Sequence, residues 1–135
     1  MTPKVSHHSL RIDWSDIDAF GHVNNVAILR FVQSARVTLW ETTGVLPSTS
    51  HGLLPMLAST ACRFMVPLRY PGTVTLRTTI SFIKTTSFGI QHELFDDDGT
   101  RVAIADDVVV MFSIADGKKA PSPAEVRTAF GDYEP

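Results

Sequence analysis

The fold is decided by the segment Asp16-Ile17-Asp18-Ala19-Phe20-Gly21-His22-Val23-Asn24-Asn25, a polar turn that leads into a long apolar stretch ending near Thr43. A side-chain oxygen of Asn24 or Asn25 can accept a free backbone N–H and begin a helix there, and Gly44 is a typical stop. With residues about 100° apart, one helix face is apolar throughout. It comprises Ile28, Phe31, Val32, Ala35 and Leu39 and is widened by Ala27, Leu29 and Trp40. This wide face predicts a helix covered by protein over much of its circumference.

Alternation of apolar and polar residues predicts strands on both sides of this helix. A short strand is expected over 9–14, and longer ones over about 53–64, 73–82, 88–94 and 102–114. Pro55 restricts its strand to an edge or a strand start, and Asp97-Asp98-Gly99 predicts a hairpin turn. Ser122-Pro123-Ala124-Glu125 has the pattern of a capping box and predicts a short helix over about 122–130. Because a curled sheet can wrap one helix, we expect an α+β arrangement: an antiparallel sheet wrapped around one long central helix.

Length and composition limit the possible functions. The 135 residues suit a single domain over 1–135, with a core at about 9–114. Cys62 is the only cysteine, which excludes an internal disulfide and a cysteine-rich zinc site; we expect it to be a small buried apolar side chain. The net charge of −2, without a basic cluster, argues against nucleic acid as a partner. No run approaches the ~18 apolar residues of a membrane span, and the polar start does not form a signal peptide, so we expect a soluble, cytoplasmic protein.

The segment 16–25, followed after a spacer by Ala35-Arg36, resembles the N-terminal signature of the 4-hydroxybenzoyl-CoA thioesterase family. It is also similar to the Asp-x-Asn-x-His-Val-Asn-Asn motif of plant acyl-carrier-protein thioesterases. A looser likeness continues through residues 67–72 and 84–87 and covers about 9–114. The resemblance implies the hotdog fold and hydrolysis of an acyl-CoA thioester in a site between two subunits of a homodimer, with a tetramer as the alternative. It implies no metal and no cofactor beyond the coenzyme A of the substrate.

The resemblance also implies roles for individual residues. Asp18 would be the nucleophile or general base, and a backbone N–H at the helix start, at Asn25 or its neighbour, would polarise the thioester carbonyl. This fits the positive end of a helix dipole and a nearby carboxylate. His22 matches the histidine of the plant motif and ranks second to Asp18, whereas Phe20 replaces that motif's asparagine. The residues expected to contact substrate are Phe20, Asn24, Arg69, Lys84, Thr86 and Ser87; side chains that could line the pocket are Phe20, Phe31, Met56 and Phe64.

Two charged residues have competing interpretations. Asp16 is the rival carboxylate to Asp18, but we expect it to pair with an arginine instead. Arg36 lies inside the apolar helix face, and we expect a salt bridge from it to Asp16 or Asp13.

Two other functions remain open. One is an enoyl-thioester hydratase of the same fold, although its longer motif is missing. The other is a non-catalytic acyl-CoA binder, which only Phe20 favours. Because such a short chain leaves sheet edges and helix flanks uncovered, we expect at least a dimer in each case.

Overall fold

The computed structural model describes residues 5–43, 45 and 52–131. Within this part the chain forms two α-helices, a 3₁₀ turn and six strands. In chain order these are β1 (Val5–Arg11), the 3₁₀ turn (Trp14–Asp16), α1 (Asn25–Thr43), β2 (Leu53–Phe64), β3 (Thr73–Ile83), β4 (Ser87–Phe95), β5 (Arg101–Ser113), β6 (Lys118–Lys119) and α2 (Ala124–Ala129). None of the helices described is long and apolar enough to cross a bilayer.

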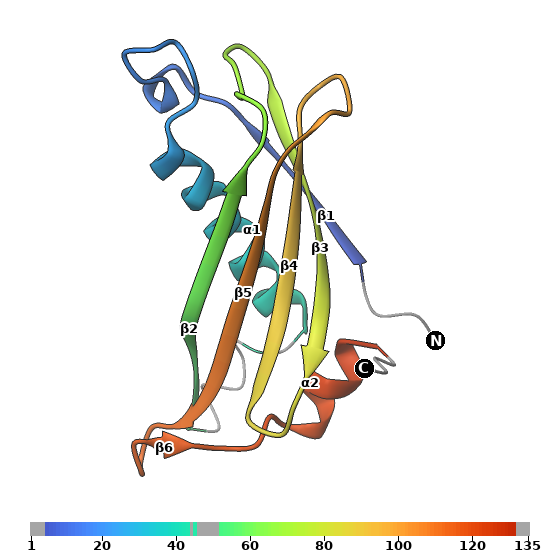
Figure 1. Cartoon of the computed structure of the whole chain (residues 1–135). Helices are drawn as coiled ribbons and strands as arrows, with labels where there is room; N and C mark the ends of the chain where they lie inside the picture. Colours follow the sequence, from blue (N-terminus) through green and yellow to red (C-terminus); the bar gives the residue numbers. More distant parts are fainter. Residues whose placement is uncertain (1–4, 44, 46–51, 132–135) are drawn as a thin grey trace.

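The strands form one antiparallel sheet with the order β1-β3-β4-β5-β2, and the short β6 pairs with β5. Helix α1 runs along one face of this sheet (Figure 1). The predicted α+β arrangement is therefore confirmed. The sheet curves but stays open, so α1 is packed against it and is not enclosed by it.

The alternation read from the sequence matches the buried face of the sheet. On β3 the inward residues are Val74, Leu76, Thr78 and Ile80; on β4 they include Phe88, Ile90, His92 and Leu94. The five residues of the predicted apolar helix face are all buried, with Phe31, Val32 and Leu39 fully so. Two clusters make up the core. The first surrounds Phe31 and the second surrounds Leu39, to which α2 contributes Val126.

Two predictions about the ends of elements are wrong, and a third lies partly outside the described residues. The first strand is Val5–Arg11 and not 9–14, because Asp13 and Asp16 form a capping box that begins a 3₁₀ turn and leaves Trp14 exposed. The predicted capping box at α2 does not form: Pro123 is the N-cap without a side-chain hydrogen bond, and the buried Ser122 Oγ has no partner among the residues described. Helix α1 ends at Thr43 as expected, but the proposed stop, Gly44, lies outside the described residues.

Strand β2 is an edge strand, as Pro55 predicted. Most of its residues are exposed in the single chain, including Leu57 and Phe64 at 38% and 44%. Figure 1 shows β2 at one edge of the sheet, next to β5. An open edge flanked by exposed apolar side chains is a typical position for a second chain.

Candidate active site

The residues between β1 and α1 form a small hairpin that presents Asp18. Ile17 and Val23 pair as an antiparallel bridge, and the Asp18 N–H donates to the His22 carbonyl at 2.9 Å. The Gly21 N–H closes the turn on the Asp18 carbonyl at 3.1 Å. Gly21 has a φ of +77°, a left-handed conformation that glycine adopts at little cost. The Asp-x-x-Gly spacing of the sequence thus creates the turn itself.

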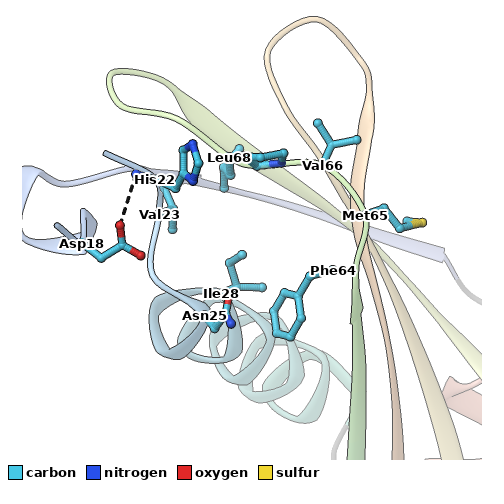
Figure 2. A pocket seen from close by; sticks show the side chains of 10 residues that line it. Asp18, His22, Val23, Asn25, Ile28, Phe64, Met65, Val66 and Leu68 are labelled. Carbon is cyan, nitrogen blue, oxygen red and sulfur yellow. Dashed lines mark hydrogen bonds between the residues drawn. The ribbon is translucent and has the colours of Figure 1, made fainter. Parts of the chain in front are cut away.

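The carboxylate of Asp18 is held from one side only. Its Oδ1 accepts the backbone N–H of Phe20 at 2.9 Å and, at 3.4 Å, that of His22. Its Oδ2 has no hydrogen-bond donor among the residues described, and the carboxylate faces the pocket (Figure 2). One oxygen therefore orients the group, while the other remains available to a substrate or a water molecule.

The N-terminus of α1 lies beside this carboxylate. The Asn24 side chain caps the helix by accepting the Val26 N–H at 2.8 Å, and the Asn24 carbonyl accepts the Ile28 N–H at 3.1 Å. The cap satisfies the N–H of Val26 and not that of Asn25, whose N–H has no acceptor within the described part of the chain. A free N–H at the positive end of a 19-residue helix can stabilise an oxygen that becomes negative.

Asp18 and Asn25 border one pocket of about 300 Å³. Its polar side is formed by these two residues and His22. Its other walls come from the hairpin, α1, the end of β2 and the connection between β2 and β3: Val23, Ile28, Phe64, Met65, Val66, Pro67 and Leu68. The Val23 N–H donates to the Leu68 carbonyl at 2.8 Å and joins the hairpin to that connection. The pocket thus combines a carboxylate and a free N–H with apolar walls.

Other residues proposed to contact substrate lie outside this lining. Phe20 is 85% exposed at the hairpin tip. Arg69 is exposed on the neighbouring loop, where it borders a second depression. Lys84, Thr86 and Ser87 lie at the turn between β3 and β4, at the other end of the sheet (Figure 1). At ~3.3 Å per residue, the length of β3 puts that turn ~30 Å away. Of the proposed pocket side chains, Phe64 lines the pocket, Phe31 is fully buried, and Met56 borders a separate apolar hollow.

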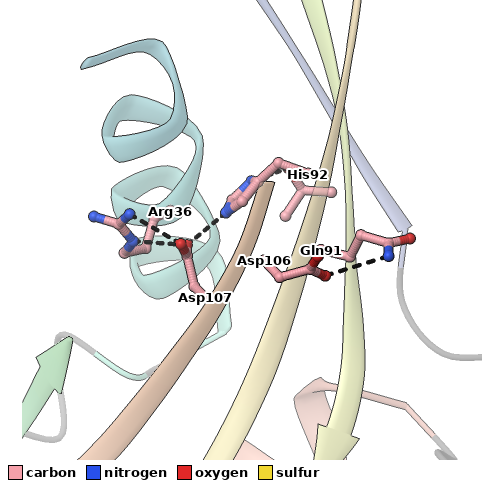
Figure 3. Close-up of polar contacts among 6 residues, drawn as sticks. Arg36, Gln91, His92, Asp106 and Asp107 are labelled. Atoms are coloured by element: carbon pink, nitrogen blue, oxygen red, sulfur yellow. Dashed lines mark hydrogen bonds and ion pairs between the residues drawn. The ribbon is translucent and has the colours of Figure 1, made fainter. Parts of the chain in front are cut away.

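Asp16 pairs with an arginine as expected, but the arginine is Arg30. Arg30 Nη2 donates to Asp16 Oδ1 at 2.5 Å. The prediction that Arg36 pairs with Asp16 or Asp13 is wrong. Arg36 instead makes two hydrogen bonds to Asp107 of β5, at 2.9 and 3.2 Å, because its position on α1 faces the sheet and not the hairpin (Figure 3).

Asp107 is the centre of a buried polar network that sequence reasoning missed. The Nε2–H of His92 donates to Asp107 Oδ2 at 2.7 Å, and His92 Nδ1 lies 3.0 Å from the Thr78 hydroxyl. Burial alone would raise the pKa of Asp107, but hydrogen bonds from His92 and Arg36, the charge of His92 and a hydrogen bond from Thr60 outweigh burial and lower the pKa to about 2. Arg36, Thr78, His92 and Asp107 are buried, whereas Thr60 is exposed on β2, and none of the five borders the Asp18 pocket.

Cys62, on β2, is half-buried and not fully buried as expected. Burial and the nearby charge of Asp107 raise the pKa of its thiol. Among the described residues, no group of three His, Cys, Asp or Glu side chains could hold a metal ion.

The fold is an antiparallel sheet with one long helix on one face, and the pocket places a carboxylate near the N-terminus of that helix. A family model described as the thioesterase-like superfamily matches residues 12–130, and the chain belongs to that superfamily. The hotdog fold is thereby confirmed, and hydrolysis of a thioester is the general chemistry of this enzyme. No curated protein sequence matches the chain significantly.

Solved structures of similar proteins agree with this assignment. A 1,4-dihydroxy-2-naphthoyl-CoA thioesterase from Synechocystis is 20% identical, with a TM-score of 0.85 over 96% of this chain and 97% of its own. A gentisyl-coenzyme A thioesterase is 25% identical, with a TM-score of 0.78 over 96% of this chain and 100% of its own. A Staphylococcus aureus protein solved in complex with CoA is 11% identical, with a TM-score of 0.84 over 96% of this chain and 83% of its own.

Proposed function

We propose that this protein hydrolyses an acyl-CoA thioester to a free acid and coenzyme A, with Asp18 as nucleophile or general base. One observation carries the proposal: the open oxygen of Asp18 and the free N–H of Asn25 border the same apolar-walled pocket. A thioester carbonyl placed between them would meet a base or nucleophile on one side and a hydrogen-bond donor on the other.

The chemistry can follow two routes. As general base, Asp18 takes a proton from water, whose oxygen attacks the thioester carbon. As nucleophile, the carboxylate attacks that carbon itself and forms a mixed anhydride, which water then hydrolyses. In both routes the Asn25 N–H stabilises the developing oxyanion, the carbon–sulfur bond breaks, and the thiolate leaves with the electron pair. His22 borders the same pocket and is the second candidate for a catalytic role.

The acyl group is the open part of the proposal. Two similar proteins are named for aromatic hydroxyacyl-CoA substrates, and a third was solved with CoA. We therefore propose coenzyme A, rather than a carrier protein, as the thiol part of the substrate, and include aromatic acyl groups among those to be tested. The proposed reaction uses no cofactor beyond this coenzyme A, and we place the protein in the cytoplasm.

We infer that the working form is a homodimer formed along β2. This edge is exposed, and the pocket is bounded by Phe64 at the C-terminal end of β2. An antiparallel second copy along β2 would carry its own β3–β4 turn towards this end of the sheet. Lys84, Thr86 and Ser87 would then serve the pocket of the neighbouring chain. A monomer in light scattering at micromolar concentration would contradict a site shared in this way.

The direct test follows thiol release from short, long and aromatic acyl-CoAs by wild type, Asp18→Asn and Asp106→Asn. Asp106 is a matched control because it is an exposed aspartate on β5 that accepts a hydrogen bond from Gln91. We expect Asp18→Asn to lose about 10²-fold or more in kcat, as loss of a general base or nucleophile requires, and Asp106→Asn to keep wild-type kcat. His22→Gln should lose less than Asp18→Asn.

Other outcomes would assign the alternatives. Hydration of crotonyl-CoA without thiol release would identify a hydratase and contradict hydrolysis. Acyl-CoA binding that is equal in wild type and Asp18→Asn, without turnover of any panel member, would identify a binding protein.

A further inference from the structure

The carboxylate of Asp16, two residues before Asp18, has a different environment. Asp16 is only 6% exposed, and both of its oxygens are engaged. Oδ2 accepts the Asp13 N–H at 2.8 Å, and Oδ1 accepts the Arg30 guanidinium at 2.5 Å. The Asp16 carbonyl also accepts the Asn24 N–H at 2.8 Å. Asp16 is therefore bound to the strand exit before the hairpin, to the helix start after it, and to a side chain of the helix.

The position of Arg30 makes this contact important for the site. Arg30 is on the second turn of α1, whose first free N–H is that of Asn25. Asp16 is at the base of the hairpin that carries Asp18. The ion pair thus joins the element that holds the carboxylate to the element that holds the oxyanion donor. Without it, the backbone hydrogen bonds from Asn24 to Asp16 and from Val23 to Leu68 would still hold the hairpin, but the side-chain link from Asp16 to α1 would be lost.

We propose that the Asp16–Arg30 ion pair is a positioning device that fixes Asp18 relative to the N-terminus of α1. This inference rests on the proposed function, because it assigns a role in the same site. Arg30 and Asp16 do not border the Asp18 pocket but a separate hollow that Asn24 also lines, so in this proposal they act on the reaction through Asp18 and Asn25. A displacement of ~1 Å between reacting groups can cost ~10²-fold in rate. A modest loss of alignment should therefore appear in kcat before it appears in stability.

The positioning role of Arg30 has to be separated from a purely structural one. Its side chain is 57% exposed, whereas that of Asp16 is 6% exposed, so thermal unfolding must be measured beside kcat to separate a loss of stability from a loss of alignment. The chain offers a matched control in Arg101, which is 47% exposed and pairs with the partly buried Glu93 at 3.0 Å on the outer face of the sheet. Loss of Arg101 removes an exposed cation but leaves Glu93 paired with Arg77 at 3.0 Å, whereas loss of Arg30 removes the cation that pairs with Asp16. Only Arg30 is next to the hairpin.

The test compares Arg30→Met, Arg30→Lys and Arg101→Met by acyl-CoA hydrolysis and thermal unfolding. We expect Arg30→Met to lower kcat by about tenfold to a hundredfold with KM within about twofold, as misalignment of catalytic groups requires. Arg30→Lys should recover most of kcat, because an ammonium can still meet Asp16. Arg101→Met should keep wild-type kcat. A rise in KM at constant kcat in Arg30→Met would overturn the proposal by placing Arg30 on the substrate, and so would equal kcat values in Arg30→Met and Arg101→Met.

A second readout is independent of turnover. The amides of Phe20, Gly21 and His22 all donate to Asp18, so their hydrogen exchange reports directly on how firmly Asp18 is held. Faster exchange at these amides in Arg30→Met, but not in Arg101→Met, is expected. If the wild type hydrolyses no thioester, the proposed function fails, while this exchange pattern would still support the positioning role. Unchanged exchange in Arg30→Met would overturn that role whatever the activity.

Discussion

Asparagine in place of Asp107 should destabilise the protein strongly, because it leaves the buried guanidinium of Arg36 without a counter-charge. The Arg36 side chain is 8% exposed and that of Asp107 is 0% exposed. Their two hydrogen bonds join the middle of α1 to β5, and His92 extends the network to β4 (Figure 3). Asparagine has nearly the same shape as aspartate, so the substitution changes charge and hydrogen bonding without opening a cavity.

The expected magnitude follows from the burial of the pair. Removing one partner of a buried ion pair typically costs about 3–5 kcal/mol, because the other charge stays in a poorly solvated position. The double variant Arg36→Met, Asp107→Asn removes both charges, and the asparagine oxygen can still accept from His92. Replacement of whole buried pairs is often nearly neutral. We therefore expect the free energy of unfolding of the double variant to exceed that of Asp107→Asn by about 2 kcal/mol or more.

Urea unfolding at one fixed protein concentration measures these differences, since the apparent stability of an oligomer depends on concentration. Asp106→Asn, next along β5 but facing solvent, is the control and should change the free energy of unfolding by about 0.5 kcal/mol or less. The reasoning is refuted if Asp107→Asn costs no more than this control. It is also refuted if the double variant is less stable than Asp107→Asn.

Two further predictions concern stability. The pKa of Asp107 is about 2 in the folded chain against its ordinary 3.8. Its contribution should therefore be complete above about pH 5 and lost as the pH falls towards 2. At about 1.4 kcal/mol per pKa unit this is worth roughly 2 kcal/mol, and urea unfolding of Asp107→Asn should lack this part of the acid sensitivity. Gly89→Ala should lower the free energy of unfolding by about 1–3 kcal/mol in the same assay, because a Cβ there would lie 2.3 Å from the Phe82 ring and 2.4 Å from Ser81 Oγ. An unchanged urea midpoint would contradict this prediction, because it would mean that both side chains move aside freely.

The elements and their buried faces could be predicted from the sequence because periodicity is a local property. Thr78 and His92 fall at inward positions of the alternation in 73–82 and 88–94, and Arg36 falls within the apolar face of the helix. What periodicity could not provide was their common partner. Asp106 and Asp107 are adjacent, so one must face inward, but which one depends on the pairing of Ile90 with Asp107. The adjacent aspartates in an apolar strand were the signal that an inward carboxylate was present.

The candidate site likewise has one part that could be predicted from the sequence and one part that could not. The Asp18 turn and the cap at Asn24 are formed by residues close in sequence, so their geometry follows from local chemistry. The apolar wall from Phe64 to Leu68 comes from the end of β2 and the connection to β3. Only the docking of this connection on the hairpin, through Val23 and Leu68, brings the wall to the carboxylate. That contact has no local sequence signal.

The two carboxylates of the hairpin show why residue type alone does not assign chemistry. Asp16 and Asp18 are separated by one residue, yet the first is buried with both oxygens engaged and the second directs one oxygen into a pocket. A carboxylate saturated with donors is a poor base and a poor nucleophile, because each donor stabilises its negative charge. A carboxylate oriented through one oxygen loses less of that reactivity and keeps a defined direction. In the proposed mechanism Asp16 therefore attaches the hairpin and Asp18 reacts, so substitution of Asp16 should act on catalysis only through the placement of Asp18.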